Sequence, residues 1–142
     1  MVRAIMHGCN GHMGQVITGL IKEDADIEIV AGIDLADCRD NGYPVYTNIE
    51  DCDVKADVII DFASAKATDA LLAYGKKRGI PMVLCTTGLT DAQLAAVEEA
   101  SREVAVLKSA NMSLGVNMLL KLLKEAANIL APAGFDIEIV EK

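Results

Sequence analysis

The chain has 142 residues, enough for one domain with its own hydrophobic core. Hydrophobic residues make up 52% of it and aromatic residues 4%, which excludes a disordered chain and favours a core of aliphatic side chains. The formal net charge of −8 argues against nucleic acid and against an anionic membrane surface as partners, because both are bound through Lys and Arg.

The first half of the chain begins with an apolar run at residues 2–7, which stops at Gly8 and predicts a buried strand. Apolar residues at helical spacing then predict a helix at residues 13–21, and a second strand is predicted at residues 27–33. Residues 34–47 are polar and turn-rich, so we expect a loop with at most a short strand at its end, over residues 45–47.

The second half continues the alternation of strands and helices. Its predicted strands are residues 58–62, 82–85, 104–107 and 136–140, and its predicted helices are residues 65–78, 91–102 and 115–130. This order predicts an α/β fold, a Rossmann-type doubly wound parallel sheet in a single domain with helices on both faces. The last predicted strand runs to the end of the sequence without a turn, so we expect the chain to be interrupted there.

The four cysteines form no C-x-x-C pair and share no metal-like spacing with the two histidines. We therefore expect free thiols in a reducing compartment and no metal site. The N-terminus lacks the pattern of a signal peptide, and no apolar stretch approaches the ~20 residues of a membrane span. These features predict a cytoplasmic protein.

A glycine turn separates the first predicted strand from the first predicted helix. In G-C-N-G-H-M-G, we expect Gly8 to allow a sharp turn, Gly11 to let a phosphate approach the backbone, and Gly14 to allow close packing of the helix. The helix N-terminus behind the turn would face the phosphates. A purely structural tight turn is the alternative.

An acidic residue follows at the spacing of a dinucleotide site. Asp34 ends the second predicted strand, twenty residues after Gly14, where a carboxylate can accept hydrogen bonds from ribose hydroxyls. No basic residue follows it directly, which favours NADH over NADPH, although Arg39 lies nearby in sequence. We expect His12 either to contact a phosphate or ribose or to lie on the loop surface, and His7 to be a hydrogen-bonded residue at the end of a strand.

Three further segments follow predicted strands, at residues 61–64, 85–88 and 110–113. Because ligands lie outside the carboxyl ends of parallel strands, these segments could complete a cofactor cleft. The alternative is ordinary helix capping by Ser64, Thr90 and Ser113. For Cys85 a packing role is favoured over a nucleophilic one, since no base is identifiable.

The segments G-C-N-G-H-M-G, D-F-A-S-A-K-A-T, C-T-T-G-L-T, S-A-N-M-S-L-G-V-N-M-L-L-K-L-L and D-I-E-I-V-E-K occur in this order along the whole chain. Together they resemble dihydrodipicolinate reductase, also called 4-hydroxy-tetrahydrodipicolinate reductase. The resemblance implies hydride transfer from NADH or NADPH that reduces 4-hydroxy-tetrahydrodipicolinate, a cyclic dicarboxylate, to tetrahydrodipicolinate in the diaminopimelate route to lysine. It also implies a homotetrameric parent enzyme.

The resemblance also implies a set of cofactor-binding positions in the glycine turn, after the second strand and in the three later loops. These are Gly8, Gly11, His12, Met13, Gly14, Asp34, Phe62, Ala63, Cys85, Thr86, Thr87, Gly88, Ala110, Asn111 and Met112. The chain departs from the family pattern at three of them. His12 replaces the usual Arg, Cys85 replaces the first Gly of G-T-T-G, and Met112 replaces the usual Phe.

The family continues beyond this chain into an H-H-x-x-K-x-D-A-P-S-G-T segment that supplies the acid and the substrate clamp. The resemblance places these groups beyond Lys142, so we expect no catalytic residue here and a cofactor-binding fragment without activity. Residues 1–130 would form the dinucleotide-binding domain and residues 131–142 the start of the missing substrate domain. The alternatives are a non-catalytic NAD(H)-binding or redox-sensing module and a domain for a CoA-type ligand; the C-T-T-G and N-M-S-L-G-V-N segments argue against the sensor and the CoA domain.

Overall fold

Six strands pair into one parallel sheet, as the alternation along the sequence predicts. The computed structural model describes residues 1–140. The strands are β1 (Val2–His7), β2 (Ile27–Ile33), β3 (Val45–Tyr46), β4 (Val58–Asp61), β5 (Met82–Leu84) and β6 (Val106–Lys108). The α-helices are α1 (His12–Lys22), α2 (Thr68–Arg78), α3 (Asp91–Ser101) and α4 (Leu114–Leu130), and the 3-10 turns are η1 (Ile49–Asp51) and η2 (Ala65–Ala67).

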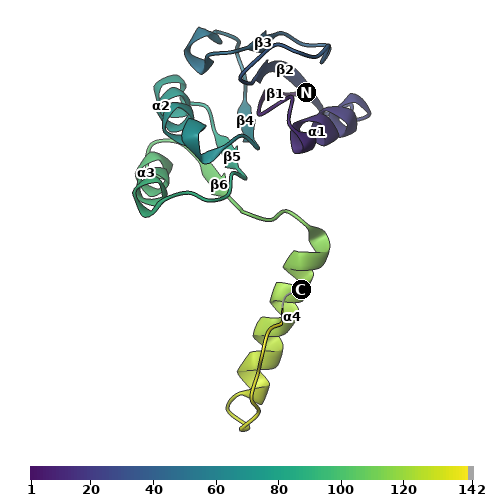
Figure 1. The fold of residues 1–142 in the computed structure, drawn as a ribbon, viewed down its shortest axis with the longest axis vertical. Coiled ribbons are helices and arrows are strands. Elements are labelled where there is room, and N and C mark those ends of the chain that lie inside the picture. Colours follow the sequence, from purple (N-terminus) through teal and green to yellow (C-terminus); the bar gives the residue numbers. More distant parts are fainter. Residues whose placement is uncertain (141–142) are drawn as a thin grey trace. The chain divides into compact units, whose positions relative to one another are not determined.

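The strand order β3-β2-β1-β4-β5-β6, with every neighbouring pair parallel, is that of a Rossmann-type doubly wound sheet. The predicted fold class is therefore confirmed. From β1 the chain steps outward to β3, and from β4 it steps outward in the opposite direction to β6. Because such crossovers are right-handed, α1 lies on one side of the sheet and α2 and α3 lie on the other (Figure 1). The direction changes between β1 and β4, whose last residues, His7 and Asp61, are register partners.

The core between sheet and helices is aliphatic, as the composition predicts. Ile5, Ile59, Leu71 and Leu84 are completely buried. Tyr74 adds a buried ring, and its hydroxyl donates a hydrogen bond to the Cys52 carbonyl oxygen at 2.6 Å. A buried phenol needs such a partner, because an unpaired buried hydroxyl costs about 1–3 kcal/mol.

The helix ends follow local sequence signals. Thr90 Oγ1 accepts a hydrogen bond from the Gln93 backbone N–H while the Gln93 side chain bonds the Thr90 backbone, which forms a capping box at the start of α3. Gly79 ends α2 in the left-handed conformation with φ +65°. The helix predicted at residues 65–78 differs only at its beginning, since its first three residues form the turn η2.

The chain divides into two compact units, Met1–Ala110 with the sheet and a second that begins at Asn111. The predicted boundary near residue 130 stays a prediction. In the second unit Ser113 caps the N-terminus of α4, its hydroxyl oxygen accepting from the Val116 N–H at 3.4 Å, and no residue of α4 is buried. None of the helices in residues 1–140 has the length and apolar character that a bilayer crossing requires.

The last predicted strand, over residues 136–140, is wrong. These residues have no strand structure. Alternation of apolar and polar residues describes the two faces of a strand, but a strand also needs a neighbour for its N–H and C=O groups. Within residues 1–140 no strand pairs with this segment.

Candidate functional site

The glycine turn has the geometry that its sequence predicts. Gly8 has φ +82°, and a Cβ there would lie 2.8 Å from the Phe62 carbonyl oxygen. A Cβ on Gly14 would overlap the Gly8 carbonyl oxygen, so α1 packs directly against the turn. At Gly11 the one contact that a Cβ would make within residues 1–140 is with the Gly8 carbonyl oxygen, at 3.3 Å, and Gly11 is exposed. Gly8 and Gly14 therefore shape the turn, and Gly11 leaves its outer side accessible.

The N-terminus of α1 lies behind this turn without a side-chain cap. Gly11 is the N-cap residue, it makes no side-chain hydrogen bond, and the first turn of α1 holds no acidic residue. The first N–H groups of a helix have no partner within the helix. In proteins such donors, together with the positive end of the helix dipole, favour the binding of an anion. His12 and Met13 are exposed beside it, and Gly14 is buried.

Asp34 lies at the end of β2, against the glycine turn. Its Oδ2 accepts a hydrogen bond from the Asn10 backbone N–H at 2.7 Å, and its Oδ1 accepts one from the Leu35 N–H at 2.8 Å. The Asn10 side chain donates to the Ala36 carbonyl oxygen at 2.6 Å. The carboxylate is half-buried and fixed in place, and each of its oxygens keeps a further lone pair for a ligand hydroxyl.

Asn41 fastens the loop after β2 to the same turn. Asn41 is 4% exposed, its Nδ2 donates to Asn10 Oδ1 at 2.9 Å, and its Oδ1 accepts from Gln15 Nε2 at 2.7 Å. Gln15 Nε2 also donates to the Cys9 carbonyl oxygen at 2.8 Å. Asn10, Gln15 and Asn41 were not among the predicted site residues. The Asn41-Gly42 dipeptide predicts a turn, but no local pattern predicts the hydrogen bond between Asn41 and Asn10, which lie 31 residues apart.

One pocket of about 520 Å³ gathers part of the predicted site at the carboxyl edge of the sheet. Its lining comes from the ends of β1 and β2, from the glycine turn, from the segments that follow β2, β3 and β4, and from the first turn of α2. The lining residues are His7, Gly8, Asn10, Gly11, Ile33, Asp34, Leu35, Thr47, Asn48, Ile49, Phe62, Ala63, Ser64, Ala67 and Ala70. The structure thus brings together five predicted positions: Gly8, Gly11, Asp34, Phe62 and Ala63.

The remaining predicted positions lie outside that lining. Cys85 and Thr86 are buried at the end of β5, whereas Thr87 and Gly88 are exposed. Burial, and after it the charge of Asp61, raises the pKa of the Cys85 thiol, which fits a packing role rather than a nucleophilic one. Ala110 ends the first unit.

Asn111 and Met112 belong to the second unit, where both are exposed. The Asn111 side-chain oxygen accepts from the Ser113 N–H at 2.8 Å, and the Asn111 carbonyl oxygen accepts from the Asn117 side chain at 2.9 Å. These bonds order the segment that leads into α4.

Helix capping explains two of the three hydroxyls for which it was the alternative. Thr90 and Ser113 accept hydrogen bonds from helix N–H groups. Ser64 makes no side-chain cap bond and lines the pocket instead. His7 differs from its prediction as a hydrogen-bonded residue. Its buried Nδ1 lies 2.7 Å from Asp61 Oδ1, within ion-pair distance, but makes no hydrogen bond of accepted geometry among residues 1–140.

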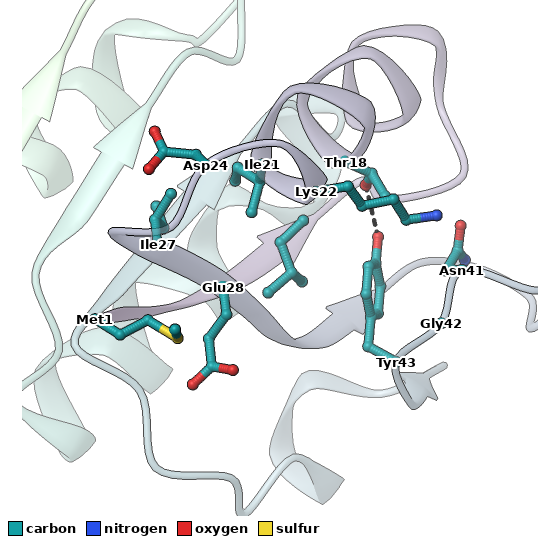
Figure 2. A pocket seen from close by; sticks show the side chains of 11 residues that line it. Met1, Thr18, Ile21, Lys22, Asp24, Ile27, Glu28, Asn41, Gly42 and Tyr43 are labelled. Atoms are coloured by element: carbon teal, nitrogen blue, oxygen red, sulfur yellow. Dashed lines mark hydrogen bonds between the residues drawn. The ribbon is translucent and has the colours of Figure 1, made fainter.

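A second pocket, of about 310 Å³, lies at the other end of β2 (Figure 2). Its walls are the end of α1, the beginning of β2 and the loop around Tyr43, whose hydroxyl lies 2.8 Å from Thr18 Oγ1. It contains none of the predicted site residues. Among residues 1–140, no group of three or more His, Cys, Asp and Glu side chains could hold a metal ion.

Comparison with known sequences identifies the family. The family model described as "Dihydrodipicolinate reductase, N-terminus" matches residues 2–112. A 4-hydroxy-tetrahydrodipicolinate reductase from Caldanaerobacter subterraneus subsp. tengcongensis is 49% identical over 142 residues, which is 100% of this chain and 55% of that protein. One of the same name from Clostridium tetani is 43% identical over 142 residues, 100% of this chain and 55% of that protein. The chain spans about half the length of the curated relatives it matches.

Solved structures share the fold. A dipicolinate-bound dihydrodipicolinate reductase from Paenisporosarcina sp. TG-14 matches with a TM-score of 0.80 and 24% identity, over 91% of this chain and 54% of that one. An Agrobacterium radiobacter oxidoreductase, solved in complex with NAD+, L-tartaric acid and magnesium, matches with a TM-score of 0.67 and 15% identity, over 89% of this chain and 41% of that one. The match of the family model over most of the chain shows that the chain belongs to the dihydrodipicolinate reductase family and contains the family's N-terminal region.

Proposed function

We propose that the pocket at the carboxyl edge binds a nicotinamide dinucleotide. One observation carries this proposal: the same pocket holds the accessible side of Gly11, in front of the uncapped N-terminus of α1, and the fixed carboxylate of Asp34. An anion position and a hydroxyl acceptor at the point where strand order reverses are what a dinucleotide requires.

The pyrophosphate would lie on the glycine turn, held by backbone N–H groups and the dipole of α1. Among the described residues, no Lys or Arg lines the pocket, so side-chain cations contribute little there. The absence of a Cβ at Gly11 leaves room for a phosphate oxygen to reach these donors.

The adenosine ribose would lie at Asp34, with its hydroxyls donating to the two carboxylate oxygens. A 2′-phosphate at this position would face a negative charge with no cation among the lining residues. We therefore propose NADH as the preferred cofactor. The nicotinamide end would extend toward Phe62 and Ala63.

We further propose that this chain is the cofactor-binding half of a 4-hydroxy-tetrahydrodipicolinate reductase, the name that its relatives carry. When bound, the cofactor would supply the hydride. Because the chain spans only 55% of those relatives, we propose that turnover requires the remaining length. The dicarboxylate substrate and the homotetramer remain predictions for the longer protein. The family match does not favour the alternative of a non-catalytic redox-sensing module.

Binding and turnover are tested separately on the purified chain. NADH in the millimolar range should raise the thermal unfolding midpoint, since a ligand at about 100 times its Kd stabilises a protein by about 2.7 kcal/mol. No shift, and no change in NADH fluorescence, would contradict the binding proposal. NADH oxidation by the chain alone with the reductase substrate would contradict the proposal that it lacks activity.

A further inference from the structure

Asp61 places a buried carboxyl group at the carboxyl edge of the sheet. It is the last residue of β4, it is 1% exposed, and the next two residues, Phe62 and Ala63, line the pocket. A buried carboxyl group is costly unless hydrogen bonds compensate it. Its neighbours in β4, Ile59 and Ile60, are aliphatic. The sheet itself therefore gives no reason for an acid at this position.

The partners of Asp61 come from the segments beyond the strands. Its Oδ2 accepts a hydrogen bond from Thr86 Oγ1 at 2.6 Å, and its Oδ1 accepts one from the Ala63 backbone N–H at 3.2 Å. Thr86 Oγ1 also lies 3.3 Å from the Ala63 carbonyl oxygen. The buried His7 Nδ1 lies 2.7 Å from Asp61 Oδ1. One side chain thus contacts the segments that end β1, follow β4 and follow β5.

The strands do not need these contacts to stay paired. The Cys85 N–H already donates to the Asp61 carbonyl oxygen at 3.0 Å, and the Phe62 N–H donates to the His7 carbonyl oxygen at 3.0 Å. The hydrogen bonds of the Asp61 side chain reach beyond the strands, to the loop that begins at Phe62 and the loop that begins at Cys85. Because the Asp61 side chain bonds both loops, through the Ala63 N–H and the Thr86 hydroxyl, it fixes their spacing, which strand pairing leaves undetermined.

We propose that Asp61 and the Thr86 hydroxyl form a positioning pair that holds these two loops at the spacing required by the nicotinamide end of the dinucleotide. The inference rests on the proposed function and assigns the two ends of the dinucleotide to two different contacts. The Asn10–Asp34 contact serves the adenosine end, and the Asp61–Thr86 contact serves the nicotinamide end. In this assignment the Thr86 side chain acts on the ligand through Asp61 and the loop, because Thr86 is 4% exposed and its hydroxyl is already bonded to Asp61.

Two ligands and three variants test the pair. ADP-ribose carries the adenosine and pyrophosphate but no nicotinamide, whereas NADH carries all three. Thr86→Val keeps the shape and removes the hydroxyl, and Thr86→Ser restores it. Thr68→Val is the matched control, because Thr68 is 1% exposed and its hydroxyl has no hydrogen-bond partner among residues 1–140.

Thr86→Val should weaken NADH about tenfold, the effect of losing one hydrogen bond to a charged group, while ADP-ribose affinity changes less than about twofold. Thr86→Ser should bind NADH like the parent chain, and so should Thr68→Val. Equal losses for both ligands, or no loss for NADH, would overturn the inference and leave the proposed function intact. A parent chain that binds neither ligand would overturn both.

A measurement on the unmodified chain decides the matter if Thr86→Val does not fold. The amide resonances of Ala63 and Thr86 should shift together on titration with reduced nicotinamide mononucleotide, and they should stay in place on titration with AMP. Shifts at these two amides with AMP alone, or with neither nucleotide, would contradict the assignment.

Discussion

The carboxylate of Asp34 accepts a hydrogen bond from the Asn10 backbone N–H at 2.7 Å, which joins the end of β2 to the middle of the glycine turn. The proposed ribose acceptor and the proposed phosphate position are therefore parts of one rigid arrangement. Asn41, in the loop after β2, is hydrogen-bonded to the same arrangement through Asn10 Oδ1 and Gln15 Nε2. Replacement of Asp34 should therefore remove the proposed ribose acceptor and also one of the hydrogen bonds that hold the glycine turn.

Replacement of Asp34 should separate the two cofactors. Asp34→Ala removes a ribose acceptor that both cofactors can use and a negative charge that opposes only the 2′-phosphate, so NADH should lose about tenfold in affinity and NADPH less. Asp34→Asn is the matched control, because its amide oxygen can still accept from Asn10. Dissociation constants for both cofactors check this by calorimetry. Equal losses for NADH and NADPH would remove Asp34 from the ribose site.

Two glycines of α1 should respond oppositely to alanine. Gly14→Ala places a methyl group against the Gly8 carbonyl oxygen and the Cys9 backbone, so we expect a loss of about 2–3 kcal/mol in the free energy of unfolding. A methyl group on Gly19 would meet no atom of the described residues within 4 Å, and Gly19→Ala should stabilise the helix by about 0.5–1 kcal/mol. Urea denaturation measures both. Similar effects of the two substitutions would contradict the close contact at Gly14.

Only Cys38 should react quickly with a thiol reagent. It is exposed, whereas Cys9, Cys52 and Cys85 are buried. Burial raises the pKa of Cys9 to about 11, and burial also raises the pKa of Cys85, so at pH 8 neither forms much of the reactive thiolate. Ellman's reagent should titrate one thiol rapidly in the native chain and four after denaturation. Rapid reaction of two or more native thiols would contradict the burial of the other cysteines.

The Arg3–Asp57 pair should make stability depend on acid. Hydrogen bonds from the Arg3 side chain, and then from its backbone N–H, hold the pKa of Asp57 at about 2. Because the folded-state pKa lies below the unfolded value of about 3.9, the pair stabilises the fold above about pH 4 and loses this effect as the pH falls toward 2. Asp57→Asn should therefore differ most from the parent at neutral pH. A difference in denaturation midpoint that stays constant from pH 6 to pH 2 would argue against this origin.

The sequence predicts those parts of the fold that have a local signal. Apolar runs that stop at Gly8 and Ile33 mark β1 and β2, and Thr90 marks the start of α3 because its capping box lies within four residues. The prediction of a strand at residues 136–140 is wrong because the alternation of apolar and polar residues does not show whether a partner strand is present.

In the candidate site, too, the sequence predicts only the parts that have a local signal. The glycine turn and Asp34 follow from their positions after the first and second strands, β1 and β2. The contacts of Asn41 with Asn10 and of Thr86 with Asp61 join residues 31 and 25 positions apart, and no local pattern marks them. Sequence alone could not show that the Thr86 hydroxyl is directed to Asp61.

The most direct test of the proposed dinucleotide site is a titration of the isotope-labelled chain with NADH, followed by the backbone amide resonances. We expect shifts that cluster at Gly8–Gly14, at Asp34 and at Phe62 and Ala63, with little change at Ile27–Ile29 in the second pocket. Shifts centred on the second pocket, or no shifts with millimolar NADH, would contradict the proposed site.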